Sequence, residues 1–139
     1  MSTTPKIAAL GPAGTNGHEA ALIASKRLYG DTQAEIVFCP RNQDVLRTVA
    51  EQKIHGVVPV ENSGEGLVGE VVKGFWMEES KRGPGRRLYA IGEIHLPIEH
   101  CLLVHRDLEK IEQVMEVISH PQALGQCSGT LDALGINKR

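Results

Sequence analysis

The chain has 139 residues and a mass of 15.1 kDa, and 41% of its residues are apolar and 23% are charged. This composition is typical of a globular domain and excludes a mainly disordered chain. A chain of this length buries roughly two thirds of the surface that its unfolded form exposes, which is enough for one core or for two small lobes. The formal net charge of −2 excludes an overall basic surface for nucleic acid.

No stretch of the sequence reaches the ~18 apolar residues that a membrane span needs, and the N-terminal residues lack the hydrophobic region of a signal peptide. Cys39, Cys101 and Cys127 are odd in number and far apart, so we expect reduced thiols in the core rather than a disulfide framework. We therefore expect a cytoplasmic protein that binds neither nucleic acid nor a membrane.

Short apolar runs alternate with helical patterns in the first half of the chain. We predict strands over residues 6–10, 35–39 and 56–60, each followed by a helix. Asn16 and Asn42 are expected to cap the first two helices, and an apolar stripe from Leu67 to Trp76 predicts a third helix that packs on a sheet. Phe75 and Trp76 continue this stripe and are predicted to lie in the core. This order indicates a mostly parallel sheet covered by helices.

The second half begins after a basic loop, which is the predicted lobe boundary. Lys81, Arg82, Arg86 and Arg87 are interleaved with Gly and Pro, a pattern typical of a solvated loop. Beyond it we predict strands over residues 88–96 and 101–104, a helix over 108–115, a strand over 116–119 and a helix from Pro121. The sequence therefore predicts an α/β chain with a first lobe over residues 1–80 and a second lobe, with a mixed sheet, over residues 81–139.

Polar side chains gather in three segments, and each segment directly follows a predicted strand, where open α/β sheets bind their ligands. The segments span residues 11–17, 61–64 and 119–122. The first segment lacks the Walker and GxGxxG patterns, so a small anion fits it better than a nucleotide. The side chains that are candidates for contacting such a ligand are Thr15, Glu61, Asn62, Ser63, Ser119, His120 and Gln122.

Each segment also has a purely structural interpretation, and the residues alone leave the choice open. Thr15 suits a helix cap as well as a ligand contact, and Ser63 suits the cap of a following helix. Ser119 or His120 suits a cap in front of Pro121, because proline is favoured at the first helical position.

Metal binding and serine hydrolysis are both disfavoured by residue spacing. His95, His100 and His105 recur every five residues, which matches no zinc-binding pattern, and the cysteines lack a CxxC pair. No GxSxG elbow of a serine hydrolase occurs in the sequence. We therefore predict no metal site.

Four ordered segments of the chain resemble the motifs of one enzyme family. They read GPAGTNGHEAA over residues 11–21, VVPVENSGEGLVGEV over 57–71, IHLPIEHCLLV over 94–104 and SHPQALGQC over 119–127. They are similar to the prephenate dehydratase motifs GPxGT(F/Y)(S/T)xxAA, GVVPIENSxEGxVxxT, LPIxHCLL and SHPQALAQC. The resemblance extends over almost the whole chain.

This resemblance implies a two-lobed, periplasmic-binding-protein-like type II fold, with lobes of mixed sheet flanked by helices and the substrate in the cleft between them. It also implies decarboxylation and dehydration of the dicarboxylate prephenate to phenylpyruvate, in phenylalanine biosynthesis, without a metal or an organic cofactor. By motif position, the seven polar side chains named above would bind the substrate from the two lobes. The resemblance leaves the catalytic group of this chain open, and its candidates are Glu61, Asn62 and Ser63.

One departure from the family pattern concerns the end of the chain. The family carries a Thr-Arg-Phe tripeptide beyond the SHPQ motif, whose Thr is the key acid or hydrogen-bond donor, and then an ACT domain, whereas this sequence ends at Arg139. We therefore expect a second lobe that is truncated before its return strand. The exposed sheet edge would pair with a second copy, giving a homodimer or higher oligomer.

Three functions are consistent with this departure. The first is a dehydratase, and the second is a non-aromatising prephenate decarboxylase. The third is a catalytically inactive module that binds prephenate or a similar carboxylate.

Overall fold

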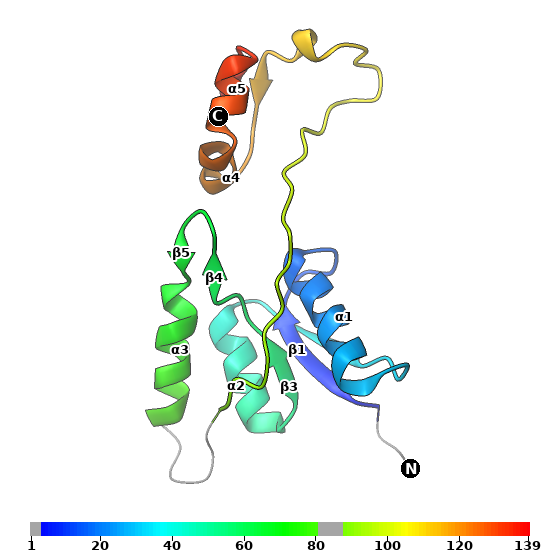
Figure 1. Cartoon of the computed structure of the whole chain (residues 1–139), viewed down its shortest axis with the longest axis vertical. Coiled ribbons are helices and arrows are strands. Elements are labelled where there is room, and N and C mark those ends of the chain that lie inside the picture. Colours follow the sequence, from blue (N-terminus) through cyan, green and yellow to red (C-terminus); the bar gives the residue numbers. More distant parts are fainter. Residues whose placement is uncertain (1–3, 81–87) are drawn as a thin grey trace. The chain divides into compact units, whose positions relative to one another are not determined.

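The computed structural model describes residues 4–80 and 88–139, and the chain forms two compact units, Met1–Leu96 and Pro97–Arg139 (Figure 1). The predicted boundary loop over residues 81–87 lies outside the described residues. The assignment of residues 1–80 and 81–139 to two lobes therefore stays a prediction. The observed architecture is mixed α/β, as the sequence indicates.

A three-stranded parallel sheet forms the centre of the first unit. Its strands are β1 (Lys6–Leu10), β2 (Glu35–Cys39) and β3 (His55–Val57), in the order β2-β1-β3. Ala8 on β1 pairs with Val37 on β2 and with Gly56 on β3. β3 ends two residues before Pro59, whose ring nitrogen has no hydrogen to donate to a neighbouring strand. This confirms the parallel sheet that the sequence predicts.

Helices α1 (Asn16–Tyr29) and α2 (Asn42–Gln52) cover the sheet, and each forms its own apolar cluster with β1. Ile7 and Ala9 pack with Ala21 and Ala24 of α1, whereas Ala8 packs with Val45 of α2. Successive β1 side chains point to opposite faces, which is why alternate residues join different clusters. Strand β1 is therefore the buried centre of the unit.

Glycine at position 56 lets α2 approach the sheet closely. A Cβ atom at this position would lie 2.3 Å from Val49 Cγ2, a distance that no real packing allows. The absence of a side chain therefore determines how near α2 lies to β3.

Both predicted asparagine caps are wrong by one residue. Thr15 caps α1, and its Oγ1 accepts a hydrogen bond from the His18 N–H at 3.4 Å. Arg41 precedes α2 without a side-chain cap bond, and Asn42 is the first helical residue. Asn42 does not act as a cap, because its side-chain oxygen, the atom that a cap uses, accepts no hydrogen bond among the described residues, while its side-chain nitrogen donates to Glu70.

A short hairpin and a third helix complete the first part of the chain. The hairpin consists of β4 (Glu61–Asn62) and β5 (Gly66–Leu67), and it leads into α3 (Gly69–Ser80). The helix packs against α2 and not on the sheet as predicted, and Figure 1 shows the two helices side by side. A Cβ atom on Gly74 would lie 3.0 Å from Leu46 Cδ1, so this face of α3 meets α2 closely.

The prediction that Trp76 lies in the core is wrong, since this residue is 71% exposed. Trp76 is two residues beyond Gly74 and is thus rotated by about 200° around the helix, away from α2. Phe75 is half-buried. The apolar stripe of α3 is therefore wider than the surface that it buries within the described residues.

The segments after residue 87 contain less regular structure than predicted. Residues 88–96 and 101–104 form no strands, and the predicted helix over 108–115 is reduced to a 3₁₀ turn at Ile111–Gln113. A strand requires a hydrogen-bonding partner, and the described residues place none beside these segments. Leu103, on the predicted second strand, is accordingly 89% exposed.

The second unit contains two short strands and two short helices. They are β6 (Glu116–Val117), α4 (Pro121–Gln126), α5 (Ser128–Ala133) and β7 (Asn137–Lys138). β6 and β7 pair in parallel, and they form the only sheet of this unit among its described residues, so the predicted mixed sheet is wrong there. The predicted late strand and the helix from Pro121 are confirmed in position, although β6 is shorter than expected.

The three cysteines are free, but only one is a core residue. Cys39 is buried beside α2, Cys127 is half-buried and Cys101 is exposed. The prediction of a core thiol is therefore wrong for Cys101, because the strand expected to bury it does not form. None of the helices in the described ranges has the length and apolar character needed to cross a bilayer.

Replacing Ile7 with Ala should lower the free energy of unfolding of the first unit by about 2–5 kcal/mol, because its fully buried side chain would leave a cavity on β1. Ile91→Ala is the matched control, since Ile91 is 67% exposed and its loss should cost less than about 0.5 kcal/mol. Urea unfolding monitored by circular dichroism measures both. Similar losses for the two variants would contradict the burial of β1.

Candidate functional site

The first candidate segment is a tight turn between β1 and α1. The Thr15 hydroxyl donates to the Pro12 carbonyl oxygen at 2.9 Å while it caps the helix. Gly14 has a φ of +85°, which favours glycine, and its N–H donates to His18 Nδ1 at 3.0 Å. The structure thus realises the cap interpretation of Thr15, and the cap shapes a turn at the carboxyl end of β1.

His18 is a residue of this turn that the sequence analysis missed. Its Nδ1 accepts the Gly14 N–H, so a neutral His18 ring carries its proton on Nε2. The ring also packs edge-to-face on Phe38 of β2, with the ring centroids 5.2 Å apart. These two contacts fix the orientation of the His18 ring, and with it the Nε2–H donor beside the turn. The only signal in the sequence is its place three residues after Thr15, in the first turn of α1.

The second candidate segment is the tip of the β4–β5 hairpin. Asn62 Oδ1 accepts the Gly64 N–H at 2.8 Å, and the Asn62 carbonyl oxygen accepts the Glu65 N–H at 3.2 Å. The interpretation that Ser63 caps a helix is therefore wrong, because a turn follows Ser63 and α3 begins only at Gly69. Asn62 is half-buried, whereas Glu61 and Ser63 are exposed. One carboxylate, one amide and one hydroxyl thus lie on a single ordered hairpin.

The first two segments leave the same edge of the central sheet. β1 and β3 are neighbouring parallel strands, so the turn after β1 and the chain after β3 both begin at carboxyl ends. This is the edge at which open α/β sheets present polar side chains and free helix N–H groups. The structure therefore confirms the predicted relation to the sheet for the first segment. The third strand covers His55–Val57 and not the predicted residues 56–60, so the second segment begins four residues after the strand, in a separate hairpin.

The third candidate segment lies in the second unit, at the start of α4. His120 Nδ1 accepts the Gln122 N–H at 3.3 Å, and Pro121 occupies the first helical turn, which confirms the predicted cap. The Ser119 N–H donates to the carbonyl oxygen of Arg139, the residue that follows β7, at 3.3 Å, and this bond holds the residue in front of the cap. Ser119 and His120 are exposed and Gln122 is half-buried. A neutral His120 ring carries its proton on Nε2, which leaves a donor available.

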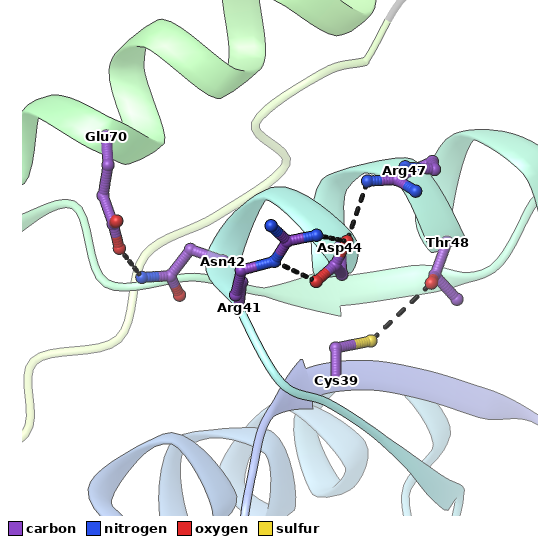
Figure 2. Close-up of polar contacts among 7 residues, drawn as sticks. All are labelled: Cys39, Arg41, Asn42, Asp44, Arg47, Thr48 and Glu70. Carbon is purple, nitrogen blue, oxygen red and sulfur yellow. Dashed lines mark hydrogen bonds and ion pairs between the residues drawn. The ribbon is translucent and has the colours of Figure 1, made fainter.

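An ion-pair cluster occupies the first turn of α2 (Figure 2). Arg41 donates to both Asp44 carboxylate oxygens, at 2.8 and 3.1 Å, and Arg47 donates to Asp44 Oδ1 at 2.8 Å. The hydrogen bond from Arg41 lowers the pKa of the Asp44 carboxyl group. Because these groups satisfy one another, the cluster stabilises the start of α2 and is not a candidate site.

A second ion-pair cluster secures β7 in the second unit. Lys138 Nζ donates to Asp132 Oδ1 at 2.6 Å and to Ser128 Oγ at 2.9 Å. The hydrogen bond from Lys138 lowers the pKa of the Asp132 carboxyl group from its ordinary value of 3.8, and Ser128 lowers it further. This cluster ties α5 to β7, the strand that precedes Arg139.

Comparison with known proteins assigns the chain to a family. The family model described as prephenate dehydratase matches residues 7–138, which include all three candidate segments. The chain belongs to the prephenate dehydratase family. The match confirms the resemblance that the four sequence motifs indicate.

The relatives of this chain include proteins named prephenate dehydratase and proteins named arogenate dehydratase. A bifunctional chorismate mutase/prephenate dehydratase of Enterobacter agglomerans is 32% identical over 124 residues, which are 88% of this chain and 29% of that protein. Arogenate dehydratase 2 of Petunia hybrida is 40% identical over 114 residues, 81% of this chain and 26% of that protein. The chain thus spans less than a third of the length of these relatives.

A solved structure also matches this member of the prephenate dehydratase family. It is a prephenate dehydratase from Streptococcus mutans with 31% identity and a TM-score of 0.44, and the match covers 52% of this chain and 36% of that one.

The stability of the second unit should depend on the charge of Asp132. Because the folded pKa of this carboxyl lies below 3.8, its stabilising effect should be complete above that pH and disappear as the pH falls through the folded pKa. Amide exchange at Arg139 should therefore differ between wild type and Asp132→Asn near neutral pH, and converge in acid. Glu109→Gln, which removes another exposed carboxyl of this unit, is the control. A difference that persists unchanged in acid would contradict the ion-pair role.

Proposed function

We propose that this chain takes part in the decarboxylation and dehydration of prephenate to phenylpyruvate. The observation that carries the proposal is the family match from residue 7 to residue 138, within which every predicted site residue lies. We extend the proposal to a two-lobed type II fold and to a cytoplasmic location. The free cysteines support that location, because persistent thiols are typical of reducing compartments.

The reaction makes two demands on the protein. Prephenate loses carbon dioxide as the bond between the ring and its carboxylate breaks, and the electron pair of that bond expels the ring hydroxyl group. One proton added to the departing hydroxide gives water, and the aromatic product is phenylpyruvate. The protein must therefore bind two carboxylates and supply one hydrogen-bond donor or acid to the leaving oxygen.

The β4–β5 hairpin is the proposed source of the catalytic group. Asn62 uses Oδ1 to accept the Gly64 N–H, so its Nδ2 remains as a donor for the substrate. The Ser63 hydroxyl can donate a hydrogen bond to the leaving oxygen. Of the three residues, Glu61 is the one whose side chain, in its protonated form, can act as a general acid toward that oxygen. We assign binding to Asn62 and the leaving-group contact to Ser63 or Glu61.

The remaining candidates are assigned to carboxylate binding. His120 presents an Nε2–H donor when its ring is neutral, and Ser119 and Gln122 add a hydroxyl and an amide. Thr15 would bind a carboxylate after its hydroxyl releases the Pro12 carbonyl. All four residues thus supply neutral donors, and no organic cofactor or metal is part of the proposal.

A second candidate substrate is arogenate, which carries an amino group in place of the prephenate keto group. The observation that favours it is the identity of 40% to arogenate dehydratase 2 of Petunia hybrida. Two further candidate functions are a non-aromatising decarboxylase and a module that binds the substrate without turnover. We also propose a homo-oligomer, supported by the open edges of β2 and β3 in the described sheet, since such edges readily pair with another chain.

The chain at high concentration should convert prephenate to phenylpyruvate faster than a protein-free control. Products are identified by mass and ultraviolet spectrum, with arogenate assayed in parallel. A decarboxylated, non-aromatic product would replace the dehydratase assignment with a decarboxylase. Binding of prephenate without turnover would leave only the binding module, and neither binding nor turnover would overturn the proposal.

Replacing Asn62 with Asp should weaken prephenate binding by at least ~10-fold, because the change removes the Nδ2 donor and places a carboxylate near the substrate carboxylates. The variant keeps an oxygen for the Gly64 N–H, so its melting temperature should stay close to that of wild type. Asn137→Asp makes the same charge change on exposed β7 and is the matched control. Calorimetric titration measures binding, and unchanged affinity in Asn62→Asp would remove Asn62 from the site.

A further inference from the structure

The contact between Asn42 and Glu70 joins the start of α2 to the first turn of α3 (Figure 2). Asn42 is 5% exposed, and its Nδ2 donates to Glu70 Oε1. Its Oδ1 is buried and has no hydrogen-bond partner among the residues that the structure describes. The side-chain nitrogen of Asn42 is therefore hydrogen-bonded, whereas its side-chain oxygen is not.

The orientation of the Asn42 amide follows from the chemistry of its partner. A carboxylate oxygen only accepts hydrogen bonds, so the atom that faces Glu70 is the nitrogen, and the oxygen is left without a donor. A buried acceptor without a partner destabilises the fold relative to an apolar side chain of similar shape. Asn42 thus stabilises the core less than an apolar residue of similar shape would. Its side-chain nitrogen, however, holds the Glu70 carboxylate by a hydrogen bond.

Glu70 belongs to the same short stretch of chain as the candidate hairpin. It follows the last residue of β5, Leu67, by three positions, and Val68 between them donates its N–H to the Val60 carbonyl oxygen at 2.8 Å. That hydrogen bond closes the base of the hairpin. Val68 also accepts from the N–H groups of Val71 and Val72, so the hairpin base and the first turn of α3 share one residue.

Two further contacts between α2 and α3 lie farther from the hairpin. Gly74 meets Leu46 one helical turn beyond Glu70, and Gln43 Nε2 lies 3.4 Å from Met77 Sδ almost another turn along. These contacts hold the two helices together. Among the polar contacts between the two helices in the described residues, the Asn42–Glu70 hydrogen bond lies nearest the end of α3 from which the hairpin extends.

We propose that Asn42 and Glu70 are positioning residues that order the β4–β5 hairpin and thereby place Asn62 and its neighbours for the substrate. The placing of Asn62 for the substrate rests on the proposed function, whereas the ordering of the hairpin concerns the structure alone. Neither residue is needed to contact the substrate. The hydrogen bond acts through the short connection between α3 and the hairpin.

The test compares two substitutions of one residue in the full chain. Glu70→Leu removes the acceptor, whereas Glu70→Gln keeps an acceptor oxygen, and both remove the negative charge from the helix N-terminus. Glu70 is exposed, so neither change opens a cavity in the core. Amide exchange measured by nuclear magnetic resonance at Gly64, Glu65 and Val68 reports on the hairpin, and exchange at Ala8 and Val37 reports on the sheet.

Glu70→Leu should raise the exchange rates of the hairpin amides about 5-fold and leave those of the sheet amides unchanged, while Glu70→Gln should resemble wild type. Prephenate affinity should fall in parallel with hairpin protection. Asn42→Leu, which removes the donor, should reproduce the effect of Glu70→Leu. Gln43→Leu removes the distal polar contact with Met77 and should leave the hairpin as it is.

The outcomes separate this inference from the proposed function. Unchanged hairpin exchange in Glu70→Leu and Asn42→Leu overturns the inference, as does equal loosening in Gln43→Leu or in Glu70→Gln. If the hairpin loosens as expected but the wild type binds no prephenate, the positioning contact is established and the proposed function fails. If the wild type binds prephenate and a loosened hairpin leaves the affinity unchanged, the contact does not position the site.

Discussion

The burial of β1 on both faces is the constraint on which the rest of the first unit depends. Ile7, Ala8 and Ala9 are fully shielded from solvent, so helices must cover both faces of the strand. Two of these side chains are methyl groups, which lets α1 and α2 approach closely. With helices on both faces, the strands are free to run parallel, and their carboxyl ends meet at one edge. The turn after β1 and the chain leading to the hairpin both start from that edge.

The parts of the fold that were predicted correctly are those with strong local signals. β1 and β2 have the predicted bounds because their apolar runs end at turn residues and their partners lie within the same unit. Residues 88–96 and 101–104 carry an equally clear strand pattern, yet they form no ladder. A strand depends on a partner that its own residues do not encode. Trp76 shows the same limit for a helix, since its periodicity marks an apolar stripe without saying how much of the stripe is covered.

The candidate site residues are predicted from sequence motifs, whereas their hydrogen bonds could not be predicted in this way. Nothing in the sequence around Thr15 shows that its hydroxyl bonds Pro12, or that His18 receives the Gly14 N–H. These bonds depend on the backbone path through the turn. The same holds for Asn62, whose oxygen serves the turn and whose nitrogen remains available. Local hydrogen bonds thus decide which donor or acceptor atom of each polar side chain remains available to a ligand.

The position of Trp76 has a consequence for optical studies of this protein. It is the single tryptophan of the chain, and it lies on the outer side of α3, away from the apolar clusters around β1. Because its side chain is largely exposed, we expect its emission to be that of an indole in water even while the sheet is intact. Intrinsic fluorescence therefore says little about melting of the core, but it responds to anything that covers the outer surface of α3.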